Sequence, residues 1–362
     1  MDLSRFDRKK LLIAGGVLAA LLVAVLAFAL TRGGGEETAA TTTSGAPTSS
    51  STTAALGPVS PLTGLPQPDE ALRNRPLLTI KIDNSPQARP QFGVDKADTV
   101  VEEKVEGGIS RFMALFQSQD SDRVGPVRSL RTTDPAWLRP EGGLIAYSGG
   151  IDGVKALLGP AGITDIGADN HGPTYYKRRS DRAFEHSLYT NTSTLRTLTP
   201  KGKAAAKPLF EFVDQGASFA GEGVAPVQTI QGRMGGDPQA TTFAWTWDPS
   251  QKKFLRTTDG KSHLFEGKGQ IAMTNVVIQY TPYRPTQYRD RANAVVDEAV
   301  TTGSGDALIL SDGKVIQGRW NRPNDGAITS FTDSTGATVK LNRGQSWLQL
   351  VPQDLRATVI NG

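Results

Sequence analysis

The sequence predicts an α+β protein with an N-terminal transmembrane helix, a flexible linker and two folded domains, the second mainly antiparallel β. Three observations lead to this prediction: an uncharged apolar run near the N-terminus, a stretch of small polar residues after it, and short alternating apolar segments in the remainder. The 39 glycines and 22 prolines among 362 residues suit strands joined by tight turns. A chain of this length can form two modest domains with real cores.

The apolar run Leu11–Leu30 contains no charged residue, and as a helix it would span about 30 Å, the hydrocarbon thickness of a bilayer. Four basic residues precede the run and one follows it closely, so the positive-inside rule places residues 1–10 in the cytoplasm. A cleaved signal peptide is the alternative, because Ala27-Phe28-Ala29 resembles a cleavage site, but the apolar part of such a peptide is usually only about 7–15 residues long. We therefore expect a single-pass protein of the cell membrane with its folded domains outside.

Residues 31–60 are rich in Thr, Ser, Gly and Ala and contain few large apolar side chains. Such a segment buries too little apolar surface to offset the entropy cost of ordering it, so we expect a disordered linker. Its typical reach as a flexible coil is about 30 Å. The folded part is therefore expected to work at the membrane surface or just beyond it.

In residues 61–225 short strands alternate with short helices, which predicts an α+β domain. Gly107-Gly108 indicates a hairpin between two apolar strands, and Asp134-Pro135 has the pattern of a capping residue followed by proline at a helix start. The predicted strands cover residues 77–82, 98–106, 109–117 and 144–148, and the predicted helices begin at residue 134 or cover residues 152–158 and 191–198.

In residues 226–362 strands and tight turns predominate, which predicts a mainly antiparallel β domain. The predicted strands and hairpins cover residues 242–248, 271–280, 307–320 and 331–352. Tryptophans recur on these strands and are expected in the core, although stacking on sugar rings is the alternative. Whether the two domains share one core stays open.

Several kinds of chemistry are excluded or disfavoured by the composition. The chain has no cysteine, so it forms no disulfide, thiolate nucleophile, cysteine-ligated zinc site or lipid-bearing cysteine. Three histidines are too few for a histidine-rich metal centre, and although a carboxylate site for a hard cation stays open, we expect no metal and no cofactor. The net charge of +4 comes largely from residues 1–32, which hold five basic and two acidic side chains, so we expect no nucleic-acid partner.

Polar residues follow the first predicted strand, where loop side chains can converge on a ligand. Asp83, Asn84 and Arg89 lie in this loop, and the alternative is a proline-stiffened turn in which they bond the local backbone. On the next strand the period of two points Glu103 towards the core, where a carboxylate needs a cation, and Arg111 across the hairpin is the nearest one.

Glu102 and Glu106 are expected to share the other face of that strand. Two carboxylates on one face can serve as general acid and general base, and structural ion pairs are the alternative.

Arg128, Ser129 and Arg131 lie close together before the predicted helix at residue 134. Arginine forks bind carboxylate or phosphate through two hydrogen bonds, so this segment predicts an anion site. The alternative is that its arginines pair with Glu103, Glu106 or Asp134.

His186 stands between a glutamate and a serine, within a run that begins at Arg178. A hydrolytic triad requires its members to meet in space, and no G-x-S-x-G motif is present, so a structural or ligand-orienting role is expected for this histidine.

Taken together, these segments resemble the YerB family, which comprises extracytoplasmic bacterial proteins with a two-part domain of unknown function. The resemblance implies a layered, α/β sandwich-like first domain and a β-rich second domain, and it implies no catalytic residue. Typical members are lipoproteins, whereas this chain has no cysteine and an apolar helix in place of a lipid. The similar segments are Pro61–Gly64, Ile82–Gln91, Ala97–Phe112, Gly125–Arg131, His186–Thr190, Asn275–Tyr280, Gly303–Trp320 and Asn342–Pro352.

The sequence thus predicts a membrane-anchored extracytoplasmic binding protein of the bacterial cell envelope. Its expected partner is an anionic cell-wall polymer or peptide, or an envelope protein. One alternative is an envelope hydrolase or transferase acting on cell-wall glycan or peptide, and the other is a protein-interaction scaffold. The predicted ligand-binding residues are Asp83, Asn84, Arg89, Glu103, Arg111, Arg128, Ser129, Arg131 and His186.

Overall fold

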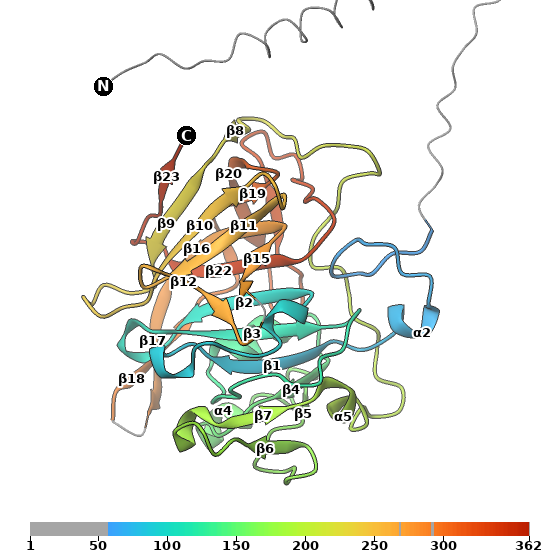
Figure 1. Cartoon of the computed structure of the whole chain (residues 1–362), viewed down its shortest axis with the longest axis vertical. Helices are drawn as coiled ribbons and strands as arrows, with labels where there is room; N and C mark the ends of the chain where they lie inside the picture. Colours follow the sequence, from blue (N-terminus) through green and yellow to red (C-terminus); the bar gives the residue numbers. More distant parts are fainter. Residues whose placement is uncertain (1–56, 268, 291–292, 362) are drawn as a thin grey trace, which may run out of the picture. The chain divides into compact units, whose positions relative to one another are not determined.

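Two β-sheets contain most of the strands in the computed structural model, which describes residues 57–267, 269–290 and 293–361 (Figure 1). The predicted transmembrane run Leu11–Leu30 and nearly all of the linker lie outside these residues. Within the described ranges, no helix has the length and apolar character needed to cross a bilayer.

The main sheet contains strands from both predicted domains. Its strands are β1 (Leu78–Asp83), β2 (Thr99–Lys104), β3 (Ser110–Phe116), β4 (Leu144–Ala146), β5 (Thr164–Asp165), β8 (Ala225–Pro226), β16 (Asn275–Thr281), β19 (Gly303–Ser311), β20 (Lys314–Arg322), β21 (Ser330–Thr332) and β22 (Ser346–Pro352). They pair in the order β21-β20-β19-β16-β22-β2-β3-β1-β4-β5, and β8 lies beside β20. The parallel pair β22–β2 joins the two halves, so one sheet continues from the first half of the chain into the second.

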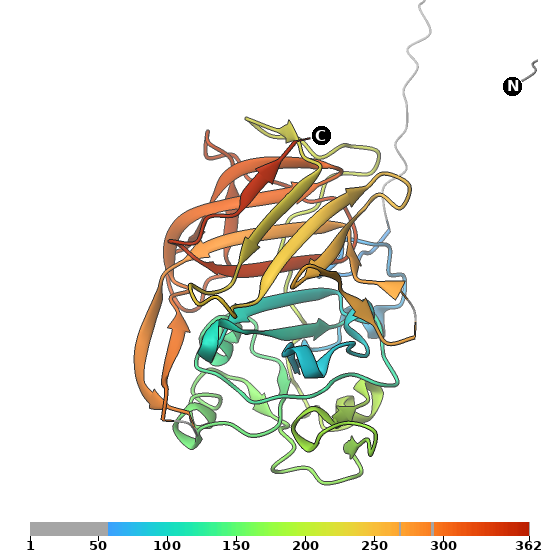
Figure 2. The same cartoon turned by 60° about the vertical axis from the view of Figure 1, so that its left-hand side comes forward.

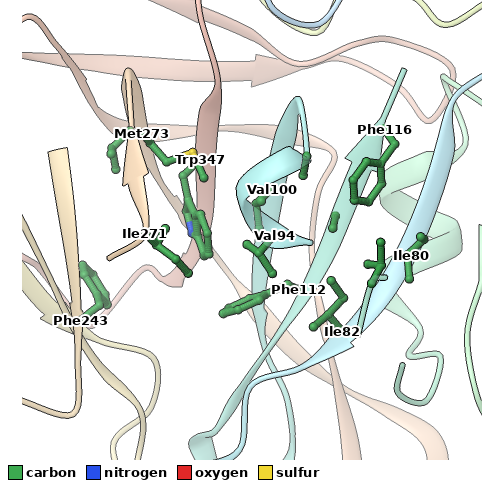
Figure 3. Packing of buried hydrophobic residues seen from close by; sticks show 14 of the residues in the cluster. Ile80, Ile82, Val94, Val100, Phe112, Phe116, Phe243, Ile271, Met273 and Trp347 are labelled. Carbon is green, nitrogen blue, oxygen red and sulfur yellow. The ribbon is translucent and has the colours of Figure 1, made fainter. Parts of the chain in front are cut away.

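A smaller sheet packs against one face of the main sheet. Its strands are β9 (Thr229–Arg233), β10 (Thr242–Asp248), β11 (Lys253–Thr258), β12 (Lys261–Ser262), β15 (Ala272–Met273) and β23 (Thr358–Ile360). Figure 3 shows side chains of the main sheet, such as Phe112 and Trp347, packed beside side chains that include Ile271 and Phe243. Trp245 and Trp347 are buried in this layer, so the tryptophans there belong to the core as expected.

The opposite face of the main sheet is covered by loops and short helices. Val101, Met113 and Leu348 point to this face, one residue out of step with Val100, Phe112 and Trp347 on the other. Because both faces are covered, β1 and β3 are buried at every position. Most side chains of these strands are apolar on both sides.

Helices contribute less than the sequence predicts, and the fold is mostly β. The helices of the described residues are α2 (Glu70–Arg73), α3 (Thr133–Leu138), α4 (Asp152–Lys155) and α5 (Thr192–Arg196). The expectation of a layered α/β sandwich in the first domain is therefore correct only in part, because loops cover much of the sheet face that longer helices would cover.

Three two-stranded pairs complete the fold: β6 (Tyr176–Arg178) with β7 (Leu188–Thr190), β13 (Leu264–Phe265) with β14 (Gly269–Gln270), and β17 (Tyr283–Arg289) with β18 (Val295–Ala299). The hairpin of β17 and β18 extends along the first half of the chain towards α4, as both overall views show (Figures 1 and 2). There the Tyr288 hydroxyl donates a hydrogen bond of 3.3 Å to the carbonyl of Gly153.

Candidate functional site

A hollow of about 660 Å³ opens beside the start of β3, and four arginines line it. We call it the arginine hollow. Its arginines are Arg111, Arg128, Arg131 and Arg178, and Ser129 and Glu185 also line it. The structure thus brings four of the predicted ligand-binding residues to one cavity. A volume of this size is typical of small-molecule sites, which measure about 300–1,000 Å³.

Two segments position the central arginines. Arg111 lies in β3 on the same face as Met113, opposite the buried Phe112. The segment before Arg128 pairs with the end of β1, because Asp83 N–H donates to Pro126 O and Arg128 N–H donates to Lys81 O, each at 2.9 Å. These backbone bonds hold Arg128 across from Asp83.

Arg111 is a buried cation whose hydrogen-bonding capacity is only partly used. The residue is 6% exposed, and its Nη1 donates to Ser129 O at 3.3 Å. Its Nε is buried without a hydrogen-bond partner, and no carboxylate of the described residues forms an ion pair with it. Burial and the nearby charge of Arg131 lower the pKa of Arg111 to about 10, although Asp83 attracts it. Such a site favours a bound anion.

Arg128 reaches the hollow beside Asp83. Its Nε lies 3.1 Å from Asp83 Oδ2 without the alignment of a hydrogen bond, and its side chain is 27% exposed. Its terminal nitrogens make no hydrogen bond within the described ranges and can receive a ligand. Burial would raise the pKa of Asp83, but the N–H of Ser85 and the charge of Arg128 outweigh burial and lower it.

Arg131 is already neutralised within the protein. Its Nε and Nη2 donate to the two carboxylate oxygens of Glu106 at 2.8 and 2.9 Å, and its Nη1 donates to Leu130 O. Pairing with Glu106 was the structural alternative for this arginine. The expectation that Glu106 shares a strand face with Glu102 is wrong, because β2 ends at Lys104 and Glu106 begins a 3₁₀ turn.

Glu103 lies outside the arginine hollow. It is fully buried, as expected, but its partner is Lys81 and not Arg111, which corrects the sequence prediction. Lys81 Nζ also lies 2.6 Å from Asp134 Oδ1, so the ammonium group is held between two carboxylates. Burial, together with the charge of Asp134, raises the pKa of Glu103 to about 7, although Lys81 opposes the rise.

Glu102 is also fully buried, because the smaller sheet covers its face of the main sheet. Its Oε1 accepts hydrogen bonds from Arg256 at 2.8 Å and Ser110 at 2.6 Å, and its Oε2 accepts from Trp347 and Gln349. Glu102 therefore belongs to a structural network and does not meet Glu106.

Asn84 and Arg89 also lie away from the hollow. Arg89 donates to Asn84 Oδ1 at 3.1 Å and pairs with Asp259 at 2.7 Å, while Asn84 donates to Ser110 Oγ at 2.8 Å. Their contacts link the loop after β1 to the smaller sheet. Neither residue lines the arginine hollow.

His186 does not line the hollow, but it contacts Asp83, which lies beside Arg128. Its Nδ1 lies 2.8 Å from Asp83 Oδ2, and Ser85 Oγ lies 3.4 Å from the same nitrogen. The ring itself does not line the cavity, whereas Phe184 and Glu185 do. The histidine is placed to orient Asp83, which in turn contacts Arg128.

Arg178, Phe184 and Glu185 are among the lining residues that were not predicted as ligand-binding. The Arg178 guanidinium lies 3.6 Å from the centre of the Phe184 ring, and this ring is 67% exposed. In the sequence, these residues belong to the charged segment around His186, which was the only indication of a possible site there. Nothing in that segment shows that it folds back beside Arg128.

Among the residues that the structure describes, no group of three His, Asp or Glu side chains could hold a metal ion. The hollow instead offers cationic hydrogen-bond donors and hydroxyl groups, beside the carboxylates of Glu106, Asp169, Glu185 and Asp290. Arginine donors of this kind can bind carboxylate or phosphate groups.

The chain matches the models of two adjacent domains: the N-terminal domain of a protein of unknown function (DUF3048) over residues 62–205, and the corresponding C-terminal domain over residues 236–348. It is 28% identical over 309 residues to YerB of Bacillus subtilis (strain 168), whose name describes a suspected lipoprotein, and this alignment covers 83% of the chain and 88% of YerB. The crystal structure of YerB from Bacillus subtilis has the same fold, with a TM-score of 0.71 at 24% identity over 83% of this chain and all of that one. The chain therefore belongs to the YerB-like family of two-domain proteins.

Proposed function

We propose that this protein is a membrane-anchored binding protein of the bacterial cell envelope, and that the arginine hollow binds an anionic group of its ligand. The ligand is a cell-wall polymer or peptide, or an acidic segment of an envelope protein. Arg111 and Arg128 provide the binding donors, and Ser129 adds a hydroxyl group. Arg131 shapes the wall through its pair with Glu106.

The buried guanidinium of Arg111 is the observation that carries this proposal. Burying a cation without a partner costs free energy, and proteins seldom keep a buried charge unpaired. Asp83 partly balances Arg128, and Glu106 balances Arg131, but Arg111 has no ion pair within the described part of the chain. A bound anion would supply the missing partner.

The envelope location is supported by two observations. YerB, a relative, is named as a suspected lipoprotein. This chain has no cysteine for a lipid, and the apolar run Leu11–Leu30 would serve as its anchor. Protease added to intact cells should digest the folded domains, and their survival until the cells are lysed would contradict this topology.

Thermal unfolding of the full chain in detergent, with and without envelope fractions, tests the binding proposal. A ligand present at about 100 times its dissociation constant stabilises the fold by about 2.7 kcal/mol. We expect stabilisation by anionic wall polymers or peptides and none in Arg128→Gln. Equal stabilisation of both proteins would place the binding elsewhere, and no stabilisation by any fraction would contradict the proposal.

A second candidate, hydrolysis of the bound ligand, is favoured by the contact between Asp83 and His186. A carboxylate that orients an imidazole is the arrangement of a general base. However, Ser85 contacts the same ring nitrogen as Asp83, so it is not placed as the nucleophile that this base would activate. Chromatography of muropeptides after incubation separates the candidates: new products that disappear in His186→Gln would indicate an enzyme, and unchanged muropeptides a binding protein.

A further inference from the structure

We infer that the ligand of the arginine hollow is an extended zwitterionic peptide, with a carboxylate at Arg111 and Arg128 and an ammonium group near Glu185. This inference rests on the proposed anion site and narrows its ligand class. It follows from the extent of the cavity, the charges along it and one exposed aromatic ring.

The cavity extends beyond the arginine hollow. A second hollow of about 740 Å³ adjoins the arginine hollow, and both are lined by Ser148, Asp169, Arg178 and Leu188. A single anion would occupy only one end of this space. A chain of several residues, bound by its carboxylate at one end, would continue from the first hollow into the second.

The two hollows also carry negatively charged side chains. Glu185 lines the arginine hollow, is exposed, and pairs with no cation of the described residues. Asp169 lies at the junction of the two hollows and pairs with Lys155 at 2.6 Å. A polymer with a phosphate in every repeat would bring negative charges against these carboxylates, and like charges repel. A zwitterionic peptide would place an ammonium group there instead.

The exposed side chain of Phe184 also lines the arginine hollow. An aromatic side chain that is 67% exposed beside a cavity offers apolar contact area to a ligand. Arg178 lies over the ring and holds the two side chains together through a cation–π contact. Alanine methyl groups or lysine methylenes of a peptide would fit this surface, whereas a glycerol phosphate backbone has little to place on it.

Isothermal titration of the full chain in detergent tests the inference. The probes are the stem peptide L-Ala-γ-D-Glu-L-Lys-D-Ala, the same peptide acetylated on both amino groups, and poly(glycerol phosphate). The variants are Arg128→Gln and Glu185→Gln. Glu222→Gln is the matched control, because Glu222 is also exposed but lies far along the chain, where its N–H donates to Asp333.

We expect the free peptide to bind about tenfold more tightly than its acetylated form, as one favourable charge contact implies. This preference should fall to about twofold or less in Glu185→Gln and stay unchanged in Glu222→Gln. Arg128→Gln should weaken both peptides by about tenfold, because it removes the contact that they share.

Each other outcome has a distinct meaning. Equal binding of the two peptides by the native chain would overturn the zwitterion inference and leave the anion site standing. Tighter binding of poly(glycerol phosphate) than of the peptide would also overturn it, in favour of a polyanion. Failure of all three probes to bind, or binding that Arg128→Gln leaves unchanged, would contradict the proposed function itself.

Discussion

The replacement of Arg111 by methionine should make the unliganded protein more stable. Methionine keeps an unbranched apolar stem and removes the buried guanidinium. Because Arg111 lines the arginine hollow, its shortening enlarges an existing opening and creates no enclosed cavity. Asp83 keeps its bonds to Ser85 and His186 and its contact with Arg128. The main change is therefore the loss of a cation that has no ion pair.

The magnitude follows from the pKa of this guanidinium. Burial and the neighbouring Arg131 lower this pKa from the ordinary value of an arginine side chain to about 10. At about 1.4 kcal/mol per pKa unit, the folded state holds the protonated group at a cost of about 3 kcal/mol, which is an upper bound. This cost is present in full at neutral pH, because Arg111 is protonated in both states there, and it disappears only as the pH rises above about 10 towards the ordinary pKa of arginine. We expect Arg111→Met to stabilise the fold by about 1–3 kcal/mol.

Urea denaturation of the full chain in detergent measures the effect, and Arg131→Met is the matched control. Arg131 lines the same cavity, but its fork is bound by Glu106, so its loss leaves a carboxylate without its partner and should destabilise the fold by about 2–4 kcal/mol. Opposite signs for the two variants would support the account. If Arg111→Met destabilises the protein as much as Arg131→Met does, Arg111 is a structural cation and our reasoning about its missing partner is wrong.

Two further predictions concern buried groups elsewhere in the fold. Arg256→Met should destabilise the protein by about 3–5 kcal/mol, because the fully buried Glu102 then loses its cation. Adding Glu102→Gln to this variant should recover part of the lost stability. If urea denaturation shows that the effects of the two substitutions simply add, the two residues are not coupled and the prediction is wrong. The pKa of Glu141 is raised to about 7 by burial, so the folded state binds its proton more tightly than the unfolded state and stability should fall as the pH rises from about 4.5 to about 7. Glu141→Gln should remove up to about 3 kcal/mol of this dependence, and pH profiles of unfolding that coincide for the two proteins would count against it.

Local patterns in the sequence identified most strands correctly. The alternation around Ile80 and the glycine pair after Glu106 predicted β1 and the hairpin of β2 and β3 to within about two residues, since side-chain period and turn residues are local properties. The proline at residue 135 and the glycine at residue 159 correctly marked two short helices, α3 and α4, although α4 ends at Lys155, three residues before the predicted end. Local patterns could not predict that the strands of both halves form one main sheet. The β22–β2 pair joins residues such as Val100 and Trp347, which are far apart in the chain.

The candidate site was partly predictable for the same reason. Arg128, Ser129 and Arg131 are neighbours in sequence, and Arg111 follows a hairpin that the glycines mark, so their convergence could be anticipated. The partners of the buried carboxylates could not be anticipated from the sequence. Lys81 on β1 reaches Glu103 on β2 only because both strands pair with β3. Arg178 joins the cavity through the β6–β7 hairpin, whose position depends on tertiary packing.

The central claim is that Arg111 and Arg128 together bind an anion. Anomalous diffraction from crystals of the chain soaked in selenate tests it most directly, because selenium marks the position of the anion without an assumption about the natural ligand. The account predicts a selenium peak in the arginine hollow, placed so that the selenate oxygens accept hydrogen bonds from the terminal nitrogens of both arginines, and no such peak in Arg111→Met. A peak only at other surface sites, or a peak in the hollow that Arg111→Met keeps, would contradict it.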